Sequence, residues 1–208
     1  MRRVIRSVCI FGILTLAFAG CASTPPSKFY QLSPAKSEAG AKHEVVKEGA
    51  VTVAVGPLRL PDYLDRPQIV TRSGRNELHM AEFDRWAGSL DDDVIMVLLE
   101  NIADLLPADR YFVTKWTPVV ETQLSSLYWV ELFVQRFEGT PGGSVVLKAQ
   151  WGLFSKDKRL ILKRQADITE PVNGPGYNAL VEAMSSALEK LSRDIADGVL
   201  SVAAERRQ

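Results

Sequence analysis

The chain has 208 residues, 46% of them apolar, and its 25 basic residues balance its 25 acidic ones. This length and apolar content are sufficient to bury the core of one domain. The lack of a basic excess argues against a nucleic-acid-binding protein, because such proteins normally carry a positive surface. The sequence contains no P-loop, no nucleophile elbow and no dinucleotide-binding glycine motif, so it shows no recognisable catalytic constellation.

The first twenty residues have the features of a secretory leader. Three arginines precede an apolar run from Val8 to Phe18, and small residues follow the run. About a dozen apolar residues are too few for a membrane-spanning helix, which needs roughly 20. We therefore expect residues 1–20 to be a signal peptide.

The end of this leader carries a second signal. Ala19 and Gly20 stand directly before Cys21, and this pattern resembles the lipobox of bacterial lipoproteins. The resemblance implies cleavage before the cysteine, attachment of diacylglycerol to its thiol and acylation of its amine. Ala22, in place of aspartate, implies sorting to the inner leaflet of the outer membrane, with the domain in the periplasm. The alternative is an ordinary leader in which a cysteine follows small residues by coincidence.

Such processing would change the composition of the mature chain. Removing the leader leaves 22 basic residues against 25 acidic ones, so the mature protein is slightly acidic. Cys9 is lost with the leader and Cys21 is consumed by lipid, so no thiol remains for a disulfide, a metal or a nucleophile. Residues 21–28 form a short tether that contains Pro25 and Pro26 and spans only about 20 Å when extended. Another protein would therefore have to bridge the periplasm.

The rest of the chain, residues 29–208, predicts one domain with eight strands. Alternating apolar residues or short apolar runs between turns indicate strands at residues 29–32, 51–55, 68–72, 77–80, 110–116, 128–135, 145–153 and 160–168. Gly56-Pro57 is expected to end the second of these strands. The fourth follows the third across a turn at Gly74, which predicts a hairpin. Residues 35–49 show no periodicity and are interpreted as a loop.

Two helices complete the predicted fold. Ser89 precedes three aspartates, whose charge suits a helix N-terminus, and an apolar face then continues to Pro107. Residues 177–202 carry a second apolar stripe, which is either core or a seam for a partner. The last three strands predict an antiparallel meander. Together these elements predict an α+β single domain, in which two α-helices pack on one face of an antiparallel β-sheet.

The sequence offers few candidates for metal or acid–base chemistry. His79 and Glu82 lie close together, but a metal site needs three or four convergent ligands. We interpret His79 as a surface or structurally hydrogen-bonded residue. The acidic run from Asp91 to Asp93 is interpreted as a helix start rather than a cation site. We therefore expect no catalytic residue, no metal and no cofactor.

The segment between Leu60 and Leu90 is the best candidate for a contact surface. It is too charged for a core and too aromatic for a solvated loop. Tryptophan and arginine are enriched where interfaces carry their binding energy, which selects Arg66, Arg72, Phe83, Arg85 and Trp86 for contact with a partner or a second copy. The alternative is a buried loop in which Asp65 or Asp84 pairs with an arginine and the aromatic rings close the sheet edge.

Four features occur together in this sequence: Cys21 with its short tether, residues 29–32, residues 64–72 (LDRPQIVTR) and residues 81–87 (AEFDRWA). In this order and spacing they resemble the ABC-type transport auxiliary lipoproteins, in particular the PqiC/YmbA-like group. The resemblance implies a non-enzymatic outer-membrane lipoprotein that works with an inner-membrane transporter subunit and a periplasm-spanning MCE-domain protein. The resemblance implies that such a system moves phospholipid or other hydrophobic molecules between the membranes and preserves envelope integrity. The resemblance also implies that residues 29–208 are one auxiliary lipoprotein domain.

A homo-oligomer is also compatible with the sequence, since closed symmetric assemblies are common. Two other functions are alternatives to the auxiliary lipoprotein. The first is a lipid-binding carrier whose sheet and helices enclose an acyl-chain cavity, lined by Trp129, Phe133, Phe137 and Trp151. The second is a periplasmic hydrolase that uses an acidic pair such as Glu131 and Asp157.

Overall fold

The computed structural model describes residues 25–35, 50–123 and 127–205. The expected signal peptide, Cys21 and most of the predicted loop at 35–49 lie outside these ranges. Within them, eight strands form one sheet: β1 Lys28–Tyr30, β2 Val51–Arg59, β3 Gln68–Arg72, β4 Leu78–Trp86, β5 Tyr111–Lys115, β6 Leu127–Gly139, β7 Ser144–Ser155 and β8 Leu160–Pro171. The helices of the described part are η1 Asp62–Leu64, α2 Leu90–Leu105, α3 Pro118–Gln123 and α4 Tyr177–Glu205.

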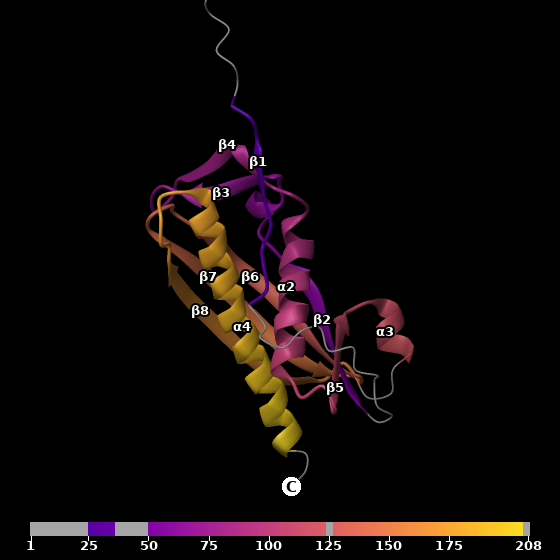
Figure 1. Ribbon diagram of the computed structural model, residues 1–208. Coiled ribbons are helices and arrows are strands. Elements are labelled where there is room, and N and C mark those ends of the chain that lie inside the picture. Colours follow the sequence, from indigo (N-terminus) through magenta and orange to yellow (C-terminus); the bar gives the residue numbers. More distant parts are fainter. Residues whose placement is uncertain (1–24, 36–49, 124–126, 206–208) are drawn as a thin grey trace, which may run out of the picture.

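The structure confirms most of the elements with strong local patterns. Strands β6, β7 and β8 form the predicted antiparallel meander, and β3 pairs with β4 as an antiparallel hairpin. Helix α2 begins directly after Ser89, carries its three aspartates in the first turn and ends before Pro107. The two long helices lie side by side on one face of the sheet (Figure 1). The α+β single domain is thus as expected.

The sheet is mixed, however, so the expectation of an antiparallel sheet is wrong. Strand β2 runs parallel to both of its neighbours, β5 and β6, and β1 runs parallel to β4. The chain between β2 and β5 includes α2, and such a long crossover connection returns the chain in a parallel direction. A period-two pattern shows which face a side chain takes but not which strand lies beside it.

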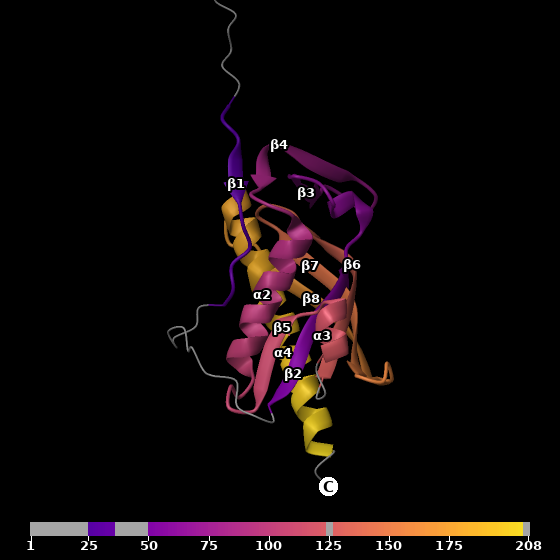
Figure 2. The same cartoon turned by 90° about the vertical axis from the view of Figure 1, so that its right-hand side faces the viewer.

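The long strand β6 makes the sheet fork. One edge of β6 pairs with β7 throughout. Its other edge pairs first with β2, between Leu127 and Phe133, and at its end with β3, where Thr71 lies opposite Gly139. The β3–β4 hairpin therefore projects from one end of the domain, where it lies across the ends of the other elements (Figure 2).

The predicted end of β2 at Gly56-Pro57 is also wrong. The strand continues to Arg59, with a shift in register against β6 between Val55 and Leu58. Gly56 has a φ of 117°, a conformation that glycine adopts without steric cost. Strand β2 therefore has an irregularity at Gly56-Pro57 and does not end there.

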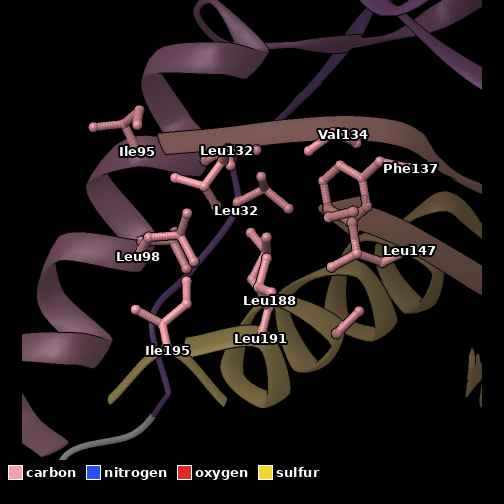
Figure 3. Packing of buried hydrophobic residues seen from close by; sticks show 14 of the residues in the cluster. Leu32, Ile95, Leu98, Leu132, Val134, Phe137, Leu147, Leu188, Leu191 and Ile195 are labelled. Carbon is pink, nitrogen blue, oxygen red and sulfur yellow. The ribbon is translucent and has the colours of Figure 1, made fainter. Parts of the chain in front are cut away.

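The main core lies between the sheet and the two long helices (Figure 3). The apolar stripe of α4 is buried here, so it belongs to the core and is not a free seam for a partner. Large side chains that are at most 1% exposed come from both layers: Leu98, Ile102, Leu188, Leu191 and Ile195 from the helices, and Leu132, Phe137, Leu147, Trp151 and Leu153 from the sheet.

A smaller apolar cluster lies on the other face of the sheet, because Ala54 and Trp129 alternate with residues of the main core. Trp116 and Val120 pack against it, so the short helix α3 covers this part of the open face. The sequence did not predict α3, since six residues are too few to show helical periodicity.

The close approach of α4 to β7 gives a test of this packing. A Cβ atom on Gly198 would lie 2.5 Å from Cη2 of Trp151 and 2.9 Å from Cδ2 of Leu162. We expect Gly198→Ala to lower the free energy of unfolding by about 1–3 kcal/mol, because overpacking outweighs the helix propensity that alanine gains. Urea unfolding measures the change. Gly88→Ala is the matched control, since no atom lies within 4 Å of the added Cβ; equal effects of the two substitutions would contradict the packing.

Candidate functional site

The first part of the described domain is an extended segment, residues 28–35, which we call the strap. Its strand β1 pairs with the end of β4, and Leu32 then inserts between α2 and α4 with only 4% of its surface exposed (Figure 3). The backbone N–H of Ser33 donates to Oγ of Ser185 at 3.1 Å, and that of Ala35 donates to Oδ1 of Asn101 at 2.8 Å. Side chains of both long helices therefore hold the strap in place.

The start of the strap is fixed to β4 and α2 by further polar contacts. The hydroxyl of Tyr30 donates to Oδ1 of Asp84 at 2.6 Å, and Ala87 N donates to the Tyr30 carbonyl at 2.8 Å. Burial and the bonded carboxylate raise the pKa of Tyr30 to about 12. Nε2 of Gln31 donates to Oδ1 of Asp93 at 3.2 Å, and burial raises the pKa of that carboxyl group.

A buried carboxylate holds the base of the hairpin. Glu138 is fully buried, and its Oε1 accepts from Nε of Arg72 and Nε of Arg136, both at 2.7 Å. Its Oε2 accepts from the hydroxyl of Tyr63 at 2.7 Å. We call these four residues the Glu138 cluster. It joins η1, β3 and β6, and therefore fixes the hairpin to the rest of the sheet.

The structure separates the residues predicted to form a contact surface. Trp86 is 4% exposed and belongs to the main core, and Arg72 belongs to the Glu138 cluster. Phe83, Arg66 and Arg85 are half-buried on or beside the hairpin. The surface expected from the sequence is thus reduced to these last three residues, and their role in binding stays a prediction.

The two half-buried arginines have no acidic partner among the described residues. Nη1 of Arg66 donates to the sulfur of Met80 at 3.0 Å, and its Nε has no hydrogen-bond partner. The side chain of Arg85 makes no hydrogen bond or ion pair within the described part. The ion pair expected in the alternative, between Asp65 or Asp84 and an arginine, does not form within the described residues, and Asp84 accepts from a tyrosine instead. The burial of Trp86 agrees with the rest of that alternative.

The open face of the sheet carries a shallow groove of about 260 Å³ between β2, β6, β7 and β8. Its walls include Phe133 and Leu160, which are 50% and 47% exposed. At Gly152 the side chains of Leu160 and Phe154 approach the backbone so closely that a Cβ atom would lie 3.0 Å from Cδ1 of Leu160 and 3.1 Å from Cε2 of Phe154. Arg59, which lies 3.9 Å from Glu131, adds polar groups at the edge of this mainly apolar groove.

The four aromatic residues expected to line one acyl-chain cavity do not do so, and that expectation is wrong. Phe137 and Trp151 are buried in the main core, at 0% and 1% exposure. Trp129 lies in the smaller cluster on the opposite face, stacked on Phe154 at 5.6 Å between ring centroids. Of the four, Phe133 alone exposes a large part of its ring to the groove. A register shift in β6 between Val134 and Arg136 moves Phe137 to the core side.

The acidic pair proposed for a hydrolase shows no shared site. The carboxylate of Glu131 is paired with Arg59 on the open face, while Asp157 lies in the turn between β7 and β8. His79 is exposed on β4. Within the described ranges, no group of three or more histidine, cysteine or acidic residues is placed to hold a metal ion. None of the helices in the described part is both long and apolar enough to span a bilayer.

The chain matches a known protein family over most of its length. Residues 30–196 match the family of ABC-type transport auxiliary lipoprotein components, and the chain belongs to that family. This is a family of transport auxiliary lipoproteins and not of enzymes. The chain is similar to the intermembrane transport lipoprotein PqiC of Escherichia coli K12 and of Shigella flexneri, with 23% identity over 188 residues. Each alignment covers 90% of this chain and 94% of the relative.

Two solved structures share the fold. A crystal structure of an uncharacterized protein superposes with a TM-score of 0.69 at 22% identity, and covers 84% of this chain and 99% of its own. A protein of Xanthomonas campestris superposes with a TM-score of 0.65 at 17% identity, covering 87% and 99%. At these identities the likeness concerns the fold alone, and it supports the α+β arrangement.

Two partly buried phenols, those of Tyr30 and Tyr63, predict an alkaline limit to the stability of the fold. The pKa values of Tyr30 and Tyr63 are both raised to about 12, because each is desolvated and donates to a carboxylate. In the unfolded chain the same phenols ionise near pH 10. The stability that they contribute is therefore complete below pH 10 and is lost as the pH rises to about 12. Thermal unfolding between pH 8 and 12 should show this loss, and Tyr63→Phe should reduce it; an unchanged profile in that variant would contradict the assignment.

Proposed function

We propose that this protein is an outer-membrane lipoprotein subunit of an MCE-type intermembrane lipid transport system. Residues 1–20 are a signal peptide, residues 21–28 a tether acylated at Cys21, and residues 29–208 a domain on the periplasmic face. The domain docks a periplasm-spanning MCE-domain protein, which works with an inner-membrane transporter subunit, and it supports envelope integrity. The observation that carries the proposal is the family match over residues 30–196.

The geometry of the described domain supports a passive docking role. Both long helices hold the strap, so a pull on the tether is transmitted to the core through Leu32 and the polar contacts at Ser33 and Ala35. The tether itself reaches only about 20 Å when extended. A domain held so close to one membrane needs a long partner to act on the other, which is the role we assign to the MCE-domain protein.

Affinity purification tests the proposed partner. The full chain, tagged at its C-terminus, is recovered from detergent-solubilised envelope and its co-purifying proteins are identified by mass spectrometry. We expect an MCE-domain protein in the eluate of the wild-type chain and a reduced yield with Cys21→Ser, which removes the proposed anchor. Lys156→Glu, in the exposed turn between β7 and β8, is the matched control. An eluate without any MCE-domain protein, under conditions that preserve other envelope complexes, would contradict the proposal.

The groove on the open face supports a second candidate function, the binding of an acyl chain. Its walls are mainly apolar, and a side chain larger than that of Gly152 would push Leu160 and Phe154 into the groove. Arg59 and Lys163 lie among the groove residues, where they could meet the phosphate of a phospholipid. Native mass spectrometry of the acylated chain should then show a bound phospholipid that Gly152→Leu abolishes. The absence of bound lipid in the wild-type protein would remove this candidate.

A further inference from the structure

We infer that the anchored domain stands with its hairpin end against the phospholipid surface and with the C-terminal end of α4 pointing away from it. By hairpin end we mean β1, the β3–β4 hairpin and residues 65–67, which lead into the hairpin and of which Arg66 contacts Met80 of β4. The inference rests on the proposed acylation of Cys21, and it adds an orientation that anchoring alone does not fix.

The chain leaves the domain toward Cys21 at the hairpin end. The described chain starts at Pro25 and enters the fold through β1, beside β4, at the end of the molecule where the hairpin lies (Figures 1 and 2). Only four residue steps separate Cys21 from Pro25. Their Cα atoms are therefore at most about 15 Å apart, whatever conformation the connection takes. An acyl chain on Cys21 would bring the membrane surface to this end of the domain.

The point at which the chain leaves the domain is fixed by the contacts of β1 and of the strap. Lys28, Phe29 and Tyr30 pair in register with Asp84, Arg85 and Trp86 of β4. The strap is held further along by buried Leu32 and by its contacts with both long helices. Moving the exit point would break these contacts together, so the tether begins at a fixed place on the domain.

The hairpin end exposes both apolar and charged side chains. Phe29 is 65% exposed and Met80 is 44% exposed, which gives this end apolar side chains suited to the interfacial layer of a bilayer. Lys28, Arg66 and Arg85 add positive charge that can meet lipid phosphates. Arg75 in the hairpin turn adds a further exposed cation, and three exposed acidic residues at this end offset most of the positive charge: Asp65, Glu77 and Glu82. Electrostatic attraction of this end to anionic lipid is therefore weak. The acyl anchor on Cys21 is what holds the hairpin end at the membrane.

The far end of the domain is well separated from this surface. Helix α4 has 29 residues and is therefore about 43 Å long. Its first residue, Tyr177, lies against Tyr30 of β1, with 6.4 Å between the ring centroids, so α4 begins at the hairpin end. Ser201 lies on its last turns and is exposed. In this orientation the far end and the open sheet face stay accessible to a protein partner, while the hairpin faces lipid.

Site-specific fluorescence quenching tests the orientation. The acylated mature chain has no other cysteine, so His79→Cys on β4 and Ser201→Cys on α4 each give one free thiol for an environment-sensitive dye. Both positions are exposed. The full acylated chain is reconstituted into phosphatidylethanolamine–phosphatidylglycerol vesicles that contain a lipid with a nitroxide on its headgroup. We expect strong loss of fluorescence at position 79 and none at position 201.

The outcomes separate this inference from the proposed function. If the chain fails to float with the vesicles, the proposed anchor is wrong, and with it the basis of the orientation. If the chain floats and both labels are quenched equally, or neither is quenched, the anchor stands and the orientation is overturned. Urea unfolding of both labelled variants confirms that each retains the wild-type fold.

Discussion

Glu138→Gln should lower the free energy of unfolding by about 3–5 kcal/mol, the cost typical of removing one partner from a buried ion pair. Glu138 is fully buried and accepts from Arg72 and Arg136, whose side chains are only 20% and 33% exposed. An amide cannot compensate two guanidinium groups, and its NH₂ group also faces donors. The loss should be greatest at the base of the hairpin, because Tyr63 and Arg72 hold η1 and β3 there.

Urea unfolding measures this change against a matched surface pair. Asp167 accepts from Lys148 at 2.7 Å, but the two side chains are 64% and 44% exposed. Asp167→Asn should therefore cost less than about 1 kcal/mol, as is usual for exposed ion pairs. Equal losses in the two variants would show that the Glu138 cluster does not hold the hairpin as described.

Trp86→Ala should also destabilise the fold strongly, by about 3–5 kcal/mol, the usual cost of truncating a large buried aromatic residue. Trp86 ends β4, pairs with Tyr30 of the strap and is buried in the main core. The variant should unfold at a lower urea concentration than the wild-type chain. It should bind the MCE-domain partner less well only because less of it is folded.

Phe83→Ala is the control for this interpretation, because Phe83 lies on the same strand and is only half-buried. Its free energy of unfolding should fall by less than that of Trp86→Ala. If instead Trp86→Ala kept wild-type stability and lost only its partner, Trp86 would be a contact residue, as the sequence pattern first suggested.

The sequence carried enough local information to predict most of the elements. The start of α2 follows from Ser89 and the aspartates after it, and the meander follows from alternating side chains with short turns. These patterns act within a few residues and depend little on the rest of the fold. The same holds for the hairpin around Gly74, which the structure shows as β3 and β4.

Strand pairing and strand ends depended on contacts that no local pattern contains. The parallel placement of β2 between β5 and β6 follows from how long connections pack. Residues 29–32 were predicted as a strand, yet the strand ends at Tyr30 and Leu32 packs between two helices instead. The backbone N–H groups of Ser33 and Ala35 after it donate to side chains of Ser185 and Asn101, which are far away in the sequence.

The candidate site was the hardest part to predict. By simple alternation Glu138 would share the core face with Val130, Leu132 and Val134, but the register shift before it turns its side chain to the other face. There Tyr63, Arg72 and Arg136 bind its carboxylate, and no local pattern predicts these contacts. Gly152 carries no sequence signal for a groove, because its importance lies in the side chains of Phe154 and Leu160 beside it. Composition could not separate buried Trp86 from its half-buried neighbours Phe83 and Arg85, and the role of these two residues in binding stays a prediction.

The acyl state of Cys21 tests the central claim most directly. The tagged chain is purified from cell envelope, digested, and its N-terminal peptide is identified by mass spectrometry. We predict a peptide that begins at Cys21 and carries a thioether-linked diacylglycerol and an amide-linked acyl chain, and we predict that Cys21→Ser removes both modifications and releases the chain from the membrane. An unmodified Cys21, or a mature N-terminus at another residue, would contradict the account.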